Sequence, residues 1–95
     1  MNQRFSSQLL RSLRNNVPIH DLIYNTLRLE SRFSDGIYRF LCPCCASFQT
    51  AINPKTNLAR CFFCQMNFNP IDLTMIVKHY SFVESVNFLS PFLPK

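Results

Sequence analysis

The chain has 95 residues, of which 47% are hydrophobic and 16% charged, and its net charge is +5. This length allows one small domain over 1–95 with a modest core, and the composition excludes a disordered chain. No apolar run reaches the about 20 residues of a membrane helix, and arginines interrupt the N-terminal segment where a signal peptide would be apolar. We therefore expect a cytoplasmic protein with reduced cysteines and no membrane partner.

Residues 1–26 are predicted to form a helical lead-in. A first helix, expected over 4–14, has apolar residues on one face and arginines on the other. The apolar residues are Phe5, Leu9, Leu10 and Leu13, and the arginines are Arg4, Arg11 and Arg14. We interpret the arginine face as solvent-exposed, with contact to phosphates or to a partner as the alternative. Pro18 suits the first turn of a second helix.

Residues 27–68 are predicted to form a small antiparallel sheet of about four to five strands. Alternating patterns predict strands over 27–33, 37–41, 47–52 and 58–63. The first two strands flank a Ser-Asp-Gly turn at 34–36, which is typical of a hairpin. Because Gly36 is the only glycine, we expect asparagine or aspartate at the other turns that need a positive φ.

Residues 69–90 are predicted to form two C-terminal helices. Asn69 is expected to cap the first helix, with Pro70 at its first position and Asp72 near the positive end of its dipole. This helix should end near Tyr80. A capping box then opens the last helix, which Pro91 ends. The capping-box residues are Ser81 and Glu84, and the inward-facing residues are Phe82, Val83, Val86 and Leu89. The whole pattern predicts an α+β fold, with a small antiparallel sheet flanked by N-terminal and C-terminal helices.

The cysteines form two Cys-x-x-Cys pairs, Cys42 with Cys45 and Cys61 with Cys64, each at the end of a predicted strand. Such pairs are typical of zinc ribbons, in which four thiolates surround a tetrahedral ion at about 2.3 Å. Metal binding would also supply folding energy that a small core lacks. Two alternatives remain open: reduced core cysteines, and an iron–sulfur cluster.

Cys44 is the fifth cysteine. Pro43 stiffens a turn that closes best on its fourth residue, which favours Cys45 over Cys44 as a ligand. We expect Cys44 to pack as a small apolar residue, with a reactive thiol as the alternative. His20 and His79 are expected to be structural or exposed. Because four thiolates leave no open position on zinc and the carboxylates are scattered, we expect no enzymatic activity and no small-molecule substrate.

With these motifs in order, residues 17–90 resemble the zinc-binding domain of bacterial DnaG-type primases. The motifs are IHDLIYNTLRLESRFSDGIYRFLCP, CPCC, CFFC and PIDLTMIVKHYSFVESVNFL. The family's usual first knuckle is Cys-Pro-x-His, so Cys45 replaces the histidine, as in some phage primase–helicases. The resemblance implies one structural zinc ion held by Cys42, Cys45, Cys61 and Cys64.

The sequence also departs from the family pattern. A Lys-Thr-Pro-Ser-Phe stretch survives only as Ser47-Phe48, and Phe63, Gln65 and Asn69 replace glycines around the second knuckle. The 95 residues contain no match to the family's polymerase domain. The resemblance therefore supports the family's fold for this chain more strongly than it supports the family's activity.

The resemblance implies a non-catalytic module that recognises single-stranded template or origin DNA for a separate primase, polymerase or helicase. A phage or mobile element would be a typical source. Bases would stack on aromatic rings of the sheet while cations follow phosphates. The candidate residues are Lys55, Arg60, Arg39, Tyr38, Phe48 and Phe63.

Two other functions are considered. The first is a protein–protein adaptor in which the ribbon is only a scaffold and the ends of the chain dock a partner or a second copy through Phe5, Phe92 and Leu93. The second is a zinc–thiol redox switch that uses Cys44.

Overall fold

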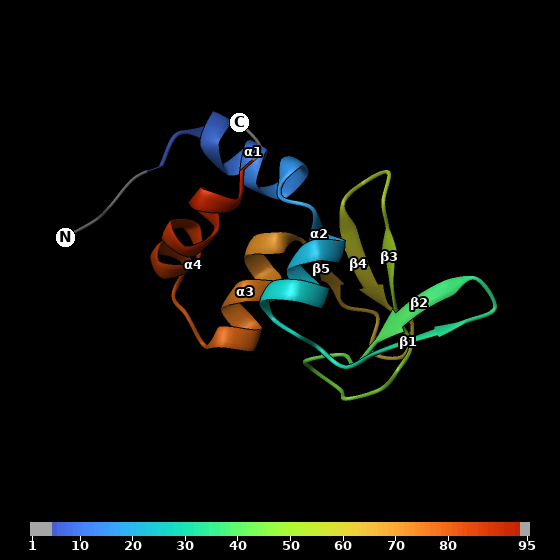
Figure 1. Ribbon diagram of the computed structural model, residues 1–95. Helices are drawn as coiled ribbons and strands as arrows, with labels where there is room; N and C mark the ends of the chain where they lie inside the picture. Colours follow the sequence, from blue (N-terminus) through green and yellow to red (C-terminus); the bar gives the residue numbers. More distant parts are fainter. Residues whose placement is uncertain (1–4, 94–95) are drawn as a thin grey trace.

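The computed structural model describes residues 5–93 and confirms the α+β class, with a five-stranded antiparallel sheet between N-terminal and C-terminal helices. Helices α1 (Ser7–Asn16), α3 (Pro70–Lys78) and α4 (Phe82–Leu89) pack together on one side, and the sheet lies on the other (Figure 1). No helix within 5–93 combines the length and the apolar character that crossing a bilayer requires.

Local capping sets the limits of the N-terminal helices. The Leu9 N–H donates to Ser6 Oγ at 3.0 Å, so α1 begins at Ser7 and not at residue 4 as predicted. Arg11 and Arg14 are exposed, whereas Arg4 lies outside the described residues. After Pro18, the short α2 (Ile19–Asp21) continues as a π-helical turn, η1 (Leu22–Thr26), which the sequence did not predict.

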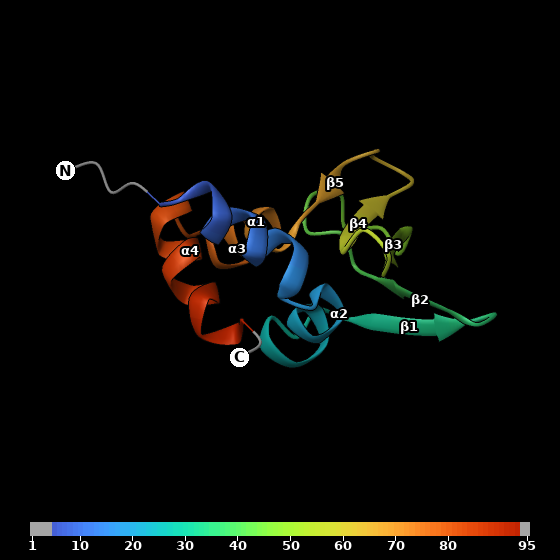
Figure 2. The same ribbon diagram turned by 90° about the horizontal axis from the view of Figure 1, so that it is seen from above.

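The strands of the sheet follow one another in chain order. They are β1 (Ser31–Ser34), β2 (Ile37–Phe40), β3 (Thr50–Asn53), β4 (Leu58–Cys61) and β5 (Asn67–Phe68). β1 begins later than the predicted residue 27, after Arg28 has taken a left-handed φ of 53°. Asp35 and Gly36, with φ of 55° and 76°, form a two-residue hairpin turn inside the predicted Ser-Asp-Gly turn, and Ser34 belongs to β1. Figure 2 shows the β1–β2 hairpin extending away from the three larger helices.

The two faces of the sheet differ in burial. One face contributes Phe40, Thr50, Ala59, Cys61 and Phe68 to the core, where they pack with residues of the helices. The opposite face remains open to solvent. Since residues directly opposite each other in antiparallel strands share a face, the register decides which side chains meet on this open face.

Asn57 joins the β3–β4 turn to the N-terminal helices. Its Oδ1 accepts from the Ile19 N–H at 3.0 Å, and its Nδ2 donates to the carbonyls of Arg14 and Val17 at 2.8 and 2.7 Å. Asn57 has a φ of 56°, as expected of an asparagine in a turn. The expectation was too narrow, however, because four other residue types also take positive φ: Arg28, Ala46, Gln65 and His79.

Both C-terminal helices have the predicted N-terminal caps. Asn69 with Asp72, and Ser81 with Glu84, form reciprocal capping boxes. α3 ends at Lys78 and not near Tyr80, because the next residue is left-handed. In α4, Val86 and Leu89 are buried as predicted, but Phe82 is 42% exposed, and its ring lies edge-on to that of Phe5 at a centroid distance of 6.2 Å. Pro91 lies in a 3₁₀ turn, η2 (Ser90–Phe92).

Candidate metal centre

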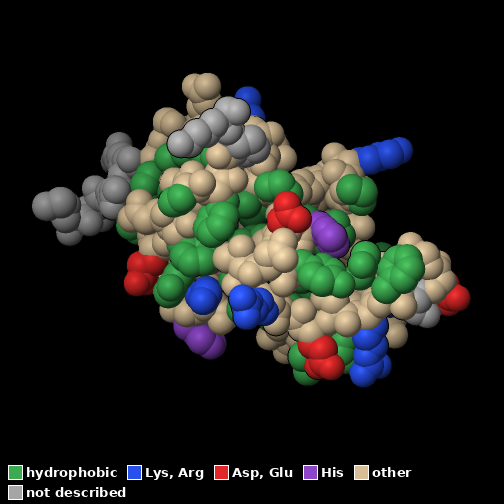
Figure 3. Space-filling view, in the orientation of Figure 1, with side chains coloured by type: hydrophobic (Ala, Val, Ile, Leu, Met, Phe, Trp, Pro, Cys, Tyr) green, Lys and Arg blue, Asp and Glu red, His purple; other side chains and the backbone are tan. Residues whose placement is uncertain are grey.

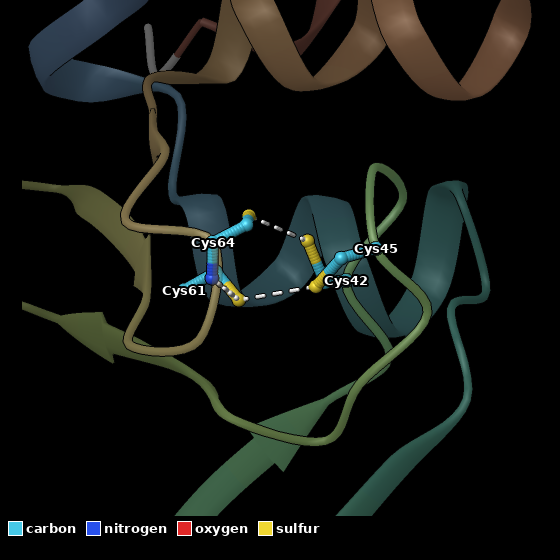
Figure 4. A group of neighbouring side chains, drawn as sticks. All are labelled: Cys42, Cys45, Cys61 and Cys64. Carbon is cyan, nitrogen blue, oxygen red and sulfur yellow. Dashed lines mark hydrogen bonds between the residues drawn. The ribbon is translucent and has the colours of Figure 1, made fainter.

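The first cysteine pair lies in a tight turn, the first knuckle, over 42–47. The Ala46 N–H donates to the Cys42 carbonyl at 2.9 Å, and the Cys42 N–H donates to the Ser47 carbonyl at 2.9 Å. Ala46 has a φ of 60°, which reverses the chain directly after Cys45. The two bonds close the turn around the pair and direct both sulfurs to one side (Figure 4).

The second pair lies in a matching turn, the second knuckle, over 61–66. The Gln65 N–H donates to the Cys61 carbonyl at 2.8 Å, and the Cys61 N–H donates to the Met66 carbonyl at 2.9 Å. Gln65 has a φ of 63°, directly after Cys64. The two knuckles therefore share one backbone design, although their sequences have only the cysteine spacing in common.

The four sulfurs face one another between the knuckles (Figure 4). The Sγ atoms of Cys42 and Cys64 are 3.8 Å apart, those of Cys45 and Cys61 are 3.5 Å apart, and all four lie within 4.8 Å of one another. Four sulfurs placed tetrahedrally at about 2.3 Å from zinc would be about 3.8 Å apart. The donor set and its spacing thus fit a zinc ion, which would link the two knuckles.

The surroundings of the cysteine cluster give the thiols of Cys61 and Cys64 different pKa values. Burial opposes ionisation of Cys61, but the backbone N–H of Cys64 and the hydroxyls of Ser47 and Thr50 favour its thiolate and lower its pKa to about 5. A backbone N–H from Met66 favours the thiolate of Cys64, yet burial and the neighbouring cysteines raise its pKa to about 12. A divalent cation among the sulfurs would remove this mutual repulsion and hold all four as thiolates.

Cys44 stands outside the cluster. The structure exposes its side chain, so the expectation that it packs as an apolar residue is wrong. Its backbone N–H donates to Cys42 Sγ at 3.4 Å, which fixes the peptide between the two ligands of the first knuckle. Partial desolvation and the neighbouring Cys42 and Cys45 raise the pKa of its thiol, which disfavours the reactive thiolate. His20 and His79 are not part of the group of potential ligands.

The sequence over residues 5–93 matches the family model of the CHC2 zinc finger, the DnaG-type zinc ribbon. The chain belongs to this zinc-ribbon family. No curated protein matches it. Family and geometry together support a zinc ion at the four cysteines, and the resemblance to DnaG-type primases is confirmed.

On the open face of this zinc ribbon, two predicted DNA-contacting residues lie in one row. Arg39 is opposite Ala51, and Ala51 is opposite Arg60. The row continues to Arg32, opposite Arg39, and to Asn67, opposite Arg60. It therefore crosses all five strands. Arg32 was missed, although a two-residue Asp-Gly turn at 35–36 already implies that residue 32 pairs with residue 39.

Aromatic rings accompany this arginine row (Arg32, Arg39 and Arg60). The Arg32 guanidinium lies 4.0 Å from the ring centroid of Phe48, and that of Arg60 lies 6.0 Å from that of Phe62. Hydrogen bonds orient two of the arginines, because Arg39 donates to Gln49 and Arg60 donates to Asn67. Among residues 5–93 the only close contact between an acidic and a basic side chain is that of Asp21 with His20, at 4.0 Å, so no carboxylate pairs with the arginine row.

The remaining predicted residues lie elsewhere. Lys55 is exposed in the β3–β4 turn, and Phe63 is 70% exposed in the second knuckle. Tyr38 pairs with Phe33 and lies on the opposite side of the hairpin from Arg39, so these two candidate residues do not share a face.

Tyr38 instead belongs to an aromatic patch of four rings: His20, Tyr24, Phe33 and Tyr38. Its centroid distance is 5.2 Å to His20, 5.4 Å to Tyr24 and 4.7 Å to Phe33. Figure 3 shows hydrophobic side chains extending from a histidine near α2 along the β1–β2 hairpin. The hairpin is thus cationic on one side and aromatic on the other.

Proposed function

We propose that this zinc ribbon is a non-catalytic module that binds single-stranded DNA through the open face of its sheet. The observation that carries the proposal is the arginine row, which runs across the sheet without a carboxylate partner among the described residues. From Arg32 to Arg60 the row spans three strand spacings, or about 14 Å. A strand crossing the sheet along this row would have its phosphates near guanidinium groups.

The rings beside the row suit the bases of such a strand. Phe48 and Phe62 each lie against an arginine, and Phe62 is 62% exposed. Stacking on rings tolerates any base, while arginines bind phosphates without reading sequence. Ala51, in the middle of the row, has a small side chain that lets a backbone approach the sheet. The arrangement favours binding that depends on strand geometry more than on base identity.

In this proposal one zinc ion has a structural role. It would link the first knuckle, which leads into Phe48 and β3, to the second knuckle, which contains Phe62. The metal would therefore hold both rings and the register of β3 with β4. The DNA would be a template or origin strand delivered to a separate primase, polymerase or helicase, as membership of a primase zinc-ribbon family suggests.

The test compares two double variants with equal loss of charge. Arg39→Gln with Arg60→Gln removes two of the three arginines of the row, and Arg11→Gln with Arg14→Gln removes two exposed arginines of α1. Binding of a labelled single-stranded oligonucleotide is measured between 50 and 200 mM salt. We expect the sheet variant to bind about tenfold more weakly or worse, with a salt slope smaller by about 0.7 for each lost phosphate contact.

The α1 variant should retain wild-type affinity within a factor of about three. The proposal is wrong if the wild-type protein shows no salt-sensitive binding, or if the two variants lose affinity equally. Circular dichroism and zinc content of each variant exclude a loss of fold as the cause.

A protein–protein adaptor is the second candidate function, and the aromatic patch favours it. The patch contains no lysine or arginine, and its His20 lies 4.0 Å from the Asp21 carboxylate, which suits a protein surface better than phosphates. The chain ends are less suitable than predicted, because Phe5 and Leu93 are half-buried against the core. Phe33→Ser should weaken association with the purified replication partner while leaving DNA binding unchanged; the opposite pattern would favour DNA.

A further inference from the structure

Thr50 has a buried hydroxyl beside the candidate metal centre. Its side chain is fully buried, and its Oγ1 makes no hydrogen bond of ordinary geometry within residues 5–93. Thr50 lies directly opposite Cys61 in the β3–β4 register, so both side chains point to the same face of the sheet. A buried hydroxyl without a partner is costly, and the Cys61 sulfur on the facing residue can accept its proton.

Ser47 provides a second hydroxyl on the same side of the cluster. Its Oγ lies 3.3 Å from the Cys45 sulfur and 3.6 Å from the Cys61 sulfur. A zinc-bound thiolate has no proton, so in each of these contacts the hydroxyl must be the donor. Because a serine hydroxyl has one proton, Ser47 can donate a full hydrogen bond only to the nearer sulfur, that of Cys45. Thr50 is then the hydroxyl donor to the Cys61 sulfur.

We propose that the Ser47 and Thr50 hydroxyls donate hydrogen bonds to the zinc-bound sulfurs of Cys45 and Cys61 and thereby set how tightly this centre holds its metal. Both are positioning residues that act on the metal through the ligands. The lowered pKa of Cys61, to which both hydroxyls contribute, agrees with this role.

The physical reason is the charge of the site. Four thiolates around Zn²⁺ carry a formal charge of −2 in a partly buried place, and hydrogen-bond donors spread that charge onto neighbouring dipoles. No hydroxyl contacts the sulfurs of Cys42 or Cys64 in the described part of the chain, where the sulfur of Cys42 accepts a backbone N–H. The hydroxyl donors therefore lie only beside Cys45 and Cys61, whereas backbone N–H groups serve Cys42 and Cys64.

The test measures zinc affinity by competition with a chelator and the sulfur-to-metal charge-transfer absorption of the Co²⁺-loaded protein. Thr50→Val keeps the side-chain shape and removes the hydroxyl, whereas Thr50→Ser keeps the hydroxyl. We expect Thr50→Val and Ser47→Ala each to weaken zinc binding by about tenfold or more and to shift the absorption band to lower energy. Thr50→Ser should retain affinity within about threefold of wild type.

Ser85 offers a matched control. It lies in α4 (Figure 1), and its hydroxyl is likewise buried without a partner among residues 5–93. Ser85→Ala should leave both readouts unchanged. The proposal is overturned if Thr50→Ser loses as much affinity as Thr50→Val, or if Ser47→Ala binds zinc as tightly as Ser85→Ala.

Ser47 is only half-buried and lies in a turn, so Ser47→Ala should fold. It therefore tests the proposal even where Thr50→Val does not fold. The inference rests on zinc occupancy of the four cysteines and is independent of DNA binding. Measuring zinc stoichiometry of the wild-type protein first separates the two: a chain that binds no zinc overturns the metal assignment, whatever its affinity for oligonucleotides.

Discussion

The two knuckles have the same backbone but different surroundings. Each closes with the same pair of backbone hydrogen bonds and places a left-handed residue directly after its second cysteine. The first knuckle contains Ser47, whose hydroxyl lies beside the sulfurs of Cys45 and Cys61, whereas the second presents Phe62 and Phe63 to solvent at 62% and 70% exposure. The backbone geometry therefore forms the metal site, and the side chains give the two knuckles different surroundings and roles.

The comparison also shows what a knuckle needs. Neither Ala46 nor Gln65 is a glycine, although both have φ near 60°. A left-handed conformation at a non-glycine residue persists only where the surrounding structure holds it. Here two hydrogen bonds and the proposed metal hold each turn, so the loss of family glycines does not remove the site.

The largest expected effect separates the ligands from the spare cysteine of the first knuckle. Cys45→Ser should lose zinc and much of the free energy of unfolding, because structural zinc sites contribute on the order of 10 kcal/mol to folding. Cys44→Ser changes an exposed side chain outside the cluster and should alter stability by less than about 0.5 kcal/mol. Zinc content and circular dichroism measure both outcomes. The reverse result would make Cys44 a ligand and would end the equivalence of the knuckles.

A second prediction concerns the two ligands of the second knuckle. A pKa of about 5 makes Cys61 a thiolate already at pH 7, whereas Cys64, with a pKa of about 12, must lose a proton when zinc binds. Zinc affinity should therefore rise with pH near neutrality with fewer than four protons released per ion. Below about pH 5 Cys61 also takes up a proton, and the affinity should fall more steeply.

Isothermal titration in buffers of different ionisation enthalpy counts these protons directly. In the metal-free fold, the depressed pKa of Cys61 contributes stability that is fully present above the pKa of an unfolded cysteine and is lost as pH falls toward 5. Release of four protons at pH 7 would show that the four cysteines are alike, contrary to the prediction.

Features that depend on local chemistry could be predicted from the sequence. Two Cys-x-x-Cys pairs, a hairpin turn at 34–36, the Asn69 cap and the Ser81–Glu84 capping box each depend on a few neighbouring residues, and all appear as expected. The capping box that Asn69 forms with Asp72 goes beyond the prediction. Features that depend on tertiary packing could not. The π-helical turn at 22–26 and the two-residue strand β5 have no periodic signal of their own.

The candidate DNA-binding face shows the same limit more sharply. Arg39 and Arg60 could be named from residue type, but their alignment through Ala51 follows from a register that joins three strands. Tyr38 was named together with Arg39 as a candidate, although strand alternation places the two on opposite faces. Asn57, whose three hydrogen bonds reach residues some 40 positions away in the chain, is visible only once the fold is known.

The smallest predicted effect tests the equivalence of the knuckles most finely. Ala46→Gly and Gln65→Gly relieve the left-handed strain at matching positions, and each should stabilise the protein by up to about 1 kcal/mol. Ala51→Gly, in the middle of β3, has no such strain to relieve and should destabilise it by about 0.5–1 kcal/mol. Urea unfolding at one fixed concentration of free zinc measures all three, because bound metal adds equally to each. An equal increase in the free energy of unfolding for Ala46→Gly and Gln65→Gly would show that the two knuckles share the same backbone strain. An increase at one knuckle alone would mean that the strain depends on the surroundings of that knuckle and not on its backbone.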